Sequence, residues 1–160
     1  MANRSKTRLE NLSLETLDPQ DHIAPNFRVY ELTRSELASR LGVNNSFLSN
    51  RELRAAVYLT RKVLQPIRDA FGSFTPNSVF RSQALERVLK RKPAGWISTS
   101  QHTQGCACDV EIVGKSTLDL ARWAADNLPD YDQIICECFD SREGPNSGWV
   151  HISLKAPGQG

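Results

Sequence analysis

Apolar residues follow two different spacings along the chain, a helical one in the first half and an alternating one in the second. In residues 51–72, Leu53, Val57 and Leu64 recur at helical spacing, and Gly72 follows the last apolar position. This pattern predicts one long amphipathic helix, the strongest helical signal in the sequence.

Three shorter segments also have helical spacing and are bounded by serine, glycine or proline: residues 31–42, 82–92 and 116–129. Ser35 and Ser116 are the predicted N-caps of the first and third of these helices. Four segments have short strand patterns: residues 74–80, 108–113, 131–139 and 148–154. Because helices come first and strands with inserted helices follow, the order predicts an α+β fold with a small, mainly antiparallel sheet packed with helices.

The chain has 160 residues, which fits one domain. Residues 1–25 are polar, and we predict an N-terminal extension that is ordered at most in part. His22, in this extension, is expected at the surface. Residues 26–160 are predicted to form the domain.

Net charge is only +2, and aromatic residues do not alternate with basic ones, so the composition argues against nucleic acid as a partner. No apolar run approaches the length of a membrane span, so no membrane partner is expected either. The first 15 residues lack the apolar core of a secretory signal. We therefore expect the protein to remain in the cytoplasm of the cell that makes it, unless another factor exports it.

The four cysteines form two Cys-x-Cys pairs, Cys106/Cys108 and Cys136/Cys138. Residues two apart in a strand share a face, and free cysteine is commonly buried. We interpret all four as small buried strand residues. A thiolate metal site or disulfides are the alternatives.

The segment SQHTQGCACDVEI, residues 100–112, contains a candidate metal site. In a straight strand His102 and Asp109 would point to opposite faces, so a shared metal requires a bend, which Gly105 permits. A catalytic zinc usually has three protein ligands, and His151 in the last strand is the candidate for the third. The alternatives are a surface-loop histidine at 102 and a core histidine at 151.

The motif resembles that of a known enzyme family. The matching pattern is Ser100-x-His102-x-x-Gly105-x-Ala107-x-Asp109, followed by Trp149-Val150-His151. It resembles the zinc D-Ala-D-Ala carboxypeptidase family, which includes murein endopeptidases and the hedgehog signalling domain. The similarity spans residues 26 to about 155 and is greatest to the subgroup common in phage and prophage genomes. It implies a hedgehog-like fold and one Zn²⁺ ion bound by His102, Asp109 and His151.

The resemblance also implies two residues that contact the substrate. The family's conserved arginine falls on Arg81, whose planar guanidinium suits a substrate carboxylate or a developing oxyanion. A structural salt bridge is the alternative for Arg81. Ser100 supports the site or contacts the substrate; a role as a cap or in a turn is the alternative.

The general base departs from the common pattern of the family, because many relatives carry an acid three residues before the last histidine, where this chain has Gly148. The phage-type subgroup instead has a glutamate at the end of the preceding strand, which matches Glu137. Asp140 and Glu143, in the following loop, are the alternatives. A carboxylate is needed to accept the proton of the attacking water and pass it to the leaving amine.

The resemblance therefore predicts a zinc peptidase that hydrolyses peptidoglycan stem or cross-link peptides, as a phage or prophage endolysin or a virion-associated wall hydrolase. Its expected location is the host cytoplasm before lysis, or the virion, where other virion proteins would be its partners. The alternative is a catalytically inactive structural or binding module of the virion that keeps the peptidase fold.

Overall fold

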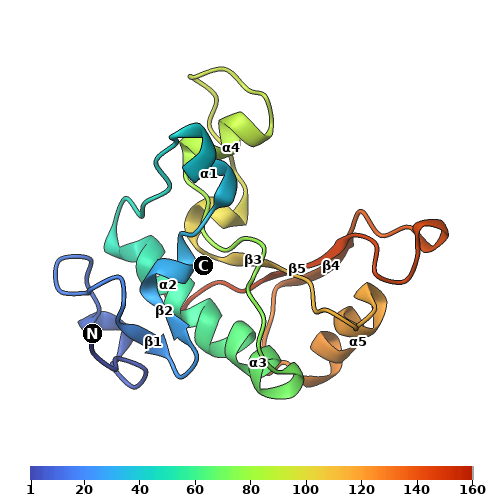
Figure 1. The fold of residues 1–160 in the computed structure, drawn as a ribbon. Coiled ribbons are helices and arrows are strands. Elements are labelled where there is room, and N and C mark those ends of the chain that lie inside the picture. The colour runs from blue at the N-terminus through green and yellow to red at the C-terminus, as the bar shows by residue number, and fades with distance from the viewer. Residues whose placement is uncertain (160) are drawn as a thin grey trace.

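The computed structural model describes residues 1–159 and has the α+β architecture that the sequence predicts (Figure 1). The helices are α1 (Glu36–Leu41), α2 (Asn50–Leu59), α3 (Gln65–Phe71), α4 (Gln83–Leu89) and α5 (Thr117–Asn127). The strands are β1 (His22–Ala24), β2 (Phe27–Arg28), β3 (Ala107–Val110), β4 (Gln133–Glu137) and β5 (Trp149–Ser153). Within residues 1–159, no helix combines the length and the apolar character needed to cross a bilayer.

The main sheet has three antiparallel strands in the order β3-β5-β4, so the last strand of the chain lies in the middle. Asp109 of β3 pairs with His151 of β5, and Glu137 of β4 pairs with Trp149 of β5. Directly opposite residues share a face of the sheet, as do residues two apart in one strand. Asp109, His151, Trp149 and Glu137 therefore lie on one face.

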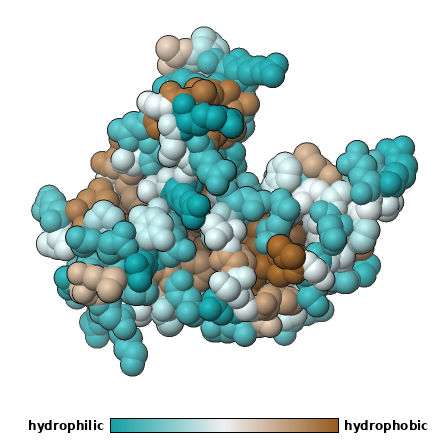
Figure 2. Space-filling view, viewed as in Figure 1, coloured by the Kyte–Doolittle hydropathy of each residue, from teal (hydrophilic) through white to brown (hydrophobic). Residues whose placement is uncertain are grey.

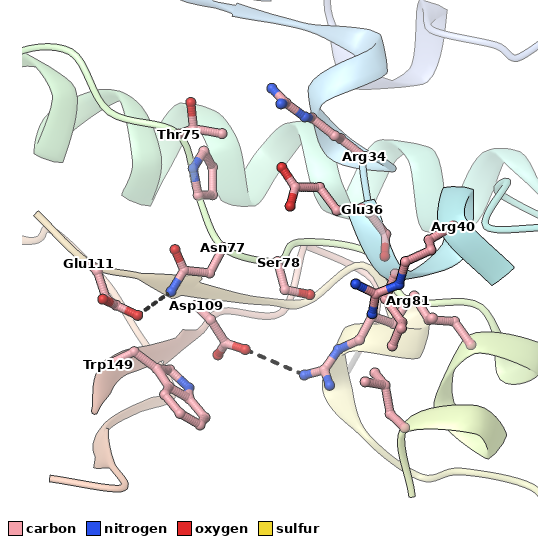
Figure 3. A pocket seen from close by; sticks show the side chains of 15 residues that line it. Arg34, Glu36, Arg40, Thr75, Asn77, Ser78, Arg81, Asp109, Glu111 and Trp149 are labelled. Carbon is pink, nitrogen blue, oxygen red and sulfur yellow. Dashed lines mark hydrogen bonds and ion pairs between the residues drawn. The ribbon is translucent and has the colours of Figure 1, made fainter. Parts of the chain in front are cut away.

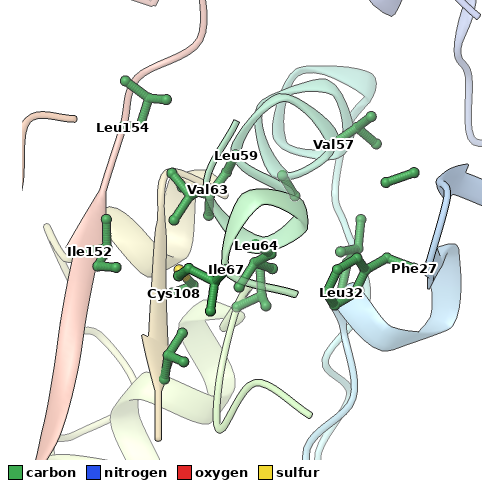
Figure 4. Packing of buried hydrophobic residues seen from close by; sticks show 14 of the residues in the cluster. Phe27, Leu32, Val57, Leu59, Val63, Leu64, Ile67, Cys108, Ile152 and Leu154 are labelled. Atoms are coloured by element: carbon green, nitrogen blue, oxygen red, sulfur yellow. The ribbon is translucent and has the colours of Figure 1, made fainter. Parts of the chain in front are cut away.

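The opposite face of β3 and β5 packs against the long helix. Residues 50–71 run as α2, a π-helical turn (Thr60–Leu64) and α3, which together match the long helix predicted from the sequence. Leu59, Val63 and Ile67 of this helix lie in one buried cluster with Cys108 and Ile152 of the sheet (Figure 4). The face of the molecule in Figure 2 is mainly hydrophilic with separate hydrophobic patches, consistent with an apolar interior.

Capping serines begin three of the helices. Ser35, Ser82 and Ser116 each accept a hydrogen bond from the backbone N–H three residues later. This confirms the two caps predicted from the sequence and adds Ser82. Gly42 ends α1 in the left-handed conformation, as expected for a helix C-terminus.

The interpretation of all four cysteines as buried strand residues holds in full for Cys108 alone, since Cys106 precedes β3 and Cys138 follows β4. Cys106 and Cys108 are buried and Cys136 is half-buried, but Cys138 is exposed. Strand β4 ends at Glu137, and Cys138 follows with a φ of +53°. The alternation of faces therefore stops before it reaches Cys138. All four cysteines are free, which excludes the disulfide alternative in this structure.

Residues 1–25 pack against the long helix. Arg61 donates hydrogen bonds to the carbonyl oxygens of Arg4 (2.8 Å), Thr7 (2.7 Å) and Ile23 (2.7 Å). Leu12 and Ile23 are buried in the main core, while His22 is half-buried in β1. The polar composition suggested at most partial order, but these few apolar residues and one arginine fix the segment. The domain boundary after residue 25 stays a prediction.

The turn into β3 depends on Gly105. A short 3₁₀ helix (Gln101–Gln104) ends at Gly105, whose φ is +73°. A Cβ atom built there would lie 2.5 Å from the carbonyl oxygen of Glu52 in α2. Gly105 therefore permits both the left-handed turn and the close approach of this turn to α2.

We expect Gly105→Ala to destabilise the fold by about 3 kcal/mol or more, because it adds a backbone collision to the left-handed strain. The matched control is Gly42→Ala, where φ is +66° and no atom lies within 4 Å of the added Cβ. The control should cost about 1 kcal/mol. Urea unfolding measures the free energy of unfolding of both variants. An equal loss of this free energy in the two variants would contradict the collision at Gly105.

Candidate metal centre

The three side chains predicted as metal ligands meet in the structure. His102, Asp109 and His151 each offer one ligand atom, and these atoms all lie within 4.8 Å of one another. All three residues are buried. Asp109 and His151 come from paired strands, and His102 reaches them because the chain reverses at Gly105.

A backbone carbonyl fixes the protonation of the His102 ring. Nδ1 of His102 lies 2.6 Å from the carbonyl oxygen of Val79, which can only accept a hydrogen bond, so Nδ1 carries the proton. The lone pair of the neutral ring is then on Nε2, 3.3 Å from Oδ1 of Asp109. Hydrogen bonding of the second ring nitrogen in this way is typical of metal-binding histidines.

The donor set fits a tetrahedral divalent ion. Oδ1 of Asp109 lies 3.3 Å from Nε2 of His102 and 3.1 Å from Nδ1 of His151. Ligand atoms about 2.0–2.1 Å from a tetrahedral zinc lie roughly 3.3 Å from one another, which agrees with both distances. With the His102 ring neutral, its buried Nε2 and the carboxylate face each other as two acceptors, an arrangement that a cation satisfies.

Asp109 is prepared to act as an anion. Burial alone would raise the pKa of Asp109, but its contacts with the rings of His102 and His151 and the charge of Arg81 outweigh burial and hold this pKa well below its usual range. The carboxylate is therefore ionised at neutral pH, as a metal ligand must be.

Arg81 lies beside the three ligands, held between two carboxylates. Its Nη2 is 3.5 Å from Oδ2 of Asp109 (Figure 3), and its Nη1 is 3.1 Å from Oε1 of Glu86 in α4. Glu86 is fully buried and also contacts Nζ of Lys90 (2.6 Å) and Oγ of Ser98 (2.8 Å). The salt bridges predicted as the alternative for Arg81 are thus present, and they orient its guanidinium at the site.

Glu137 is the predicted base that lies at the ligands. Its Oε1 is 3.9 Å from Nδ1 of His151, and its side chain is 40% exposed. It occupies the last position of β4, on the same face as His151. A partly exposed carboxylate beside the ligands has both the access to water and the position that a general base needs.

The two alternative acids are placed differently. Both carboxylate oxygens of Asp140 bind the guanidinium of Arg142, with a shortest distance of 2.6 Å, and this bond lowers the pKa of Asp140. Glu143 is exposed in the loop between β4 and β5, which extends away from the sheet (Figure 1). Among residues 1–159, Glu137 is the one of the three for which an ion-pair contact with a ligand is found.

Gly148 cannot be replaced by the acid that many relatives carry there. Its φ is +68°, and an added Cβ would collide with the carbonyl oxygen of Glu137 and the backbone of Cys138. The backbone of the β4–β5 connection therefore fills the space that a side chain at 148 would need.

Ser100 caps the turn that carries His102. Its Oγ accepts a hydrogen bond from the backbone N–H of His102 (3.3 Å), at the start of the 3₁₀ helix. Ser100 is not among the residues that line the adjoining cavity. This geometry supports the capping alternative, while a contact with substrate stays a prediction.

A groove adjoins the metal ligands. Its volume is about 750 Å³, and Asp109, Arg81 and Trp149 form the part nearest the ligands (Figure 3). Arg34, just before helix α1, and Arg40, within it, form another part of its lining. The groove gives a ligand of several residues access to the candidate metal centre.

A comparison with known families agrees with this site. A family model described as Peptidase M15 matches residues 25–153. The chain belongs to the Peptidase M15 family. Neither a search of curated proteins nor a search of solved structures found a match. M15 peptidases depend on zinc, and the His-Asp-His cluster is a group of side chains that could bind such an ion.

Glu86 is the part of this M15 peptidase site that the sequence reading missed. The spacing of its segment, residues 82–92, predicts a helix but no buried acid. Glu86 follows Leu85 on the inner side of α4 and lies five positions after Arg81. An acid on the buried side of a short helix close to Arg81 was the available signal.

We expect His102→Ala to lose most of its zinc after chelation and reloading, because one of three ligands is removed. His22→Ala is the matched control, since His22 is the one histidine outside the cluster. Metal analysis by mass spectrometry measures both variants. Full zinc content in His102→Ala would exclude the proposed ligand set.

We expect Glu86→Gln to retain zinc but to lower kcat/KM for peptide cleavage roughly tenfold, because Arg81 loses the carboxylate that orients it. If Glu86 acts through Arg81, the same change should have little effect in an Arg81→Ala background. The four variants of this cycle separate orientation from general destabilisation. If the two substitutions lower kcat/KM by factors that simply multiply in the double variant, Glu86 does not act through Arg81.

Proposed function

We propose that this M15 peptidase hydrolyses peptide bonds of peptidoglycan stem or cross-link peptides. The observation that carries the proposal is the carboxylate of Glu137 beside the His-Asp-His cluster, 3.9 Å from His151 and open to solvent. A zinc ion, when bound, supplies the Lewis acidity that activates water for attack on a peptide carbonyl. The residues around it supply the proton transfer and the substrate contacts.

Glu137 is the proposed general base. Its carboxylate accepts the proton of the attacking water and passes it to the amine that leaves. Its exposed position at the end of β4 supports both steps, because water and substrate must reach the same oxygen atoms.

Arg81 is the proposed substrate contact. Its guanidinium is held by Glu86 and Asp109 and lines the groove, so little conformational freedom is lost when it binds an anion. It suits a substrate carboxylate or the oxyanion that develops on the scissile carbonyl. A carboxylate ligand would favour carboxypeptidase action, and an oxyanion ligand is compatible with either a carboxypeptidase or an endopeptidase.

The biological setting follows from the resemblance to phage-type relatives. We propose an endolysin or a virion-associated wall hydrolase of a phage or prophage, with peptidoglycan peptides as its substrate and other virion proteins as partners in the second case. The rival function is an inactive structural or binding module, which is supported by the glycine at position 148 and by the long loop that precedes Trp149.

We expect the zinc-loaded protein to release new amino groups from purified peptidoglycan, and Glu137→Gln to lower kcat by about 10²–10⁴-fold with zinc still bound. Glu143→Gln, in the neighbouring loop, is the matched control and should keep its activity. Mass spectrometry of the products identifies the bond. Zinc binding without any release by the unsubstituted protein would favour the inactive module.

A further inference from the structure

A second cavity, of about 860 Å³, lies where the N-terminal segment, the long helix and the C-terminal end meet. The N-terminal segment and the C-terminal end both lie beside α2 (Figure 1). We call it the basic cavity; it is lined by residues 5–10, Arg51, Arg54, Tyr58, Arg61, Lys62 and residues 156–159. None of these residues lines the groove at the metal ligands, so the two cavities are separate.

The residues that line the basic cavity carry mainly positive charge. It includes six of the chain's 20 Lys and Arg residues but only one of its 18 Asp and Glu residues, Glu10. These side chains give the lining a formal charge of +5, whereas the whole chain carries +2. The remainder of the chain is therefore net negative, and the basic cavity concentrates the positive potential in one place.

Two of the cations, Arg54 and Arg61, form part of the cavity wall, and their hydrogen bonds go to uncharged acceptors. Arg61 donates to three backbone carbonyls, and Arg54 donates to those of Leu12 (2.9 Å) and Glu10 (3.2 Å). These bonds fix the N-terminal segment to the helix, yet every acceptor is an uncharged carbonyl. Burial lowers the pKa of Arg61, the expected sign for a cation that lacks a compensating anion.

Four further cations surround these two and are exposed: Lys6, Arg8, Arg51 and Lys62. Within residues 1–159, Arg8 alone among them has a carboxylate partner, Glu10, at 4.0 Å between two exposed side chains. A salt bridge between two exposed side chains contributes little to stability. The basic cavity thus presents several unneutralised charges along three segments of chain, which suits an extended ligand with repeated negative charges.

We propose that the basic cavity binds a phosphate-bearing polyanion of the cell wall, with anionic repeats that face successive cations. Phosphate is favoured because guanidinium groups bind it through several N–H donors. Such a contact would hold the peptidase to the wall at a second place, away from the metal centre. The wall as the source of the polymer rests on the proposed function; the preference for a polyanion rests on the cavity alone.

Nucleic acid is the competing polyanion, and the lining argues against it. Binding of single strands combines cations with aromatic side chains on which bases stack. The basic cavity has one aromatic residue, Tyr58, and it is half-buried in the helix. A chain without bases needs no such platform.

The test is binding of a fluorescently labelled poly(glycerol phosphate) chain, followed by anisotropy at about 50 and about 200 mM salt. The variant is Arg51→Ala/Lys62→Ala, which removes two exposed cations of the cavity. Lys115→Ala/Arg122→Ala is the matched control, because it removes two exposed cations elsewhere. Single-stranded DNA of equal charge is the comparison ligand, and cleavage of a soluble stem peptide is measured in parallel.

We expect the cavity variant to bind the polymer at least about tenfold more weakly and with a shallower salt dependence, while the control binds normally. Both should cleave the soluble peptide as the unsubstituted protein does. Equal binding by variant and control, or no binding at all, would overturn the proposal, and tighter binding of DNA would replace it with a nucleic-acid site. Selective polymer binding without peptide cleavage would support the cavity and overturn the proposed function instead.

Discussion

The pairing of β3 with β5 is the constraint on which the rest of the structure depends. It places Asp109 opposite His151 on one face of the sheet and Cys108 opposite Ile152 on the other. The first pair belongs to the metal centre and the second to the core under the long helix. A slip of one residue would exchange these faces, so the site would lose its ligands and the core would receive charged groups. The hydrophobic core thus enforces the register that the metal centre needs.

Burying two histidines and a carboxylate together is costly unless their charges are balanced. The structure balances them through a continuous series of contacts from the sheet to α4. Asp109 contacts Arg81, Arg81 contacts Glu86, and Glu86 contacts Lys90 near the surface. Signs alternate along this series, so each buried charge has an opposite neighbour. The same contacts orient Arg81 at the groove, so what stabilises the buried charges also prepares the substrate contact.

The sequence predicted well that His102, Asp109 and His151 lie together, because the first two belong to a compact motif. Gly105, His102 and Asp109 lie within eight residues, and a bend at a glycine is visible from residue types alone. Glu86 was missed because helical spacing does not show which side of a short helix faces a neighbouring residue, and only the folded chain shows that Glu86 faces Arg81. Cys138 was misplaced for a local reason, since strand alternation cannot be extended past an unrecognised strand end.

The departure from the relatives at position 148 has a structural explanation. A left-handed glycine there lets the β4–β5 connection fold back tightly against the backbone of Glu137 and Cys138. That close return leaves no room for a side chain at 148, but it sets the end of β4 opposite Trp149, two residues before His151. The side chain of Glu137 is thereby brought to the face of the sheet that holds the ligands. The absence of an acid before the last histidine and the presence of one at the end of β4 are consequences of the same turn.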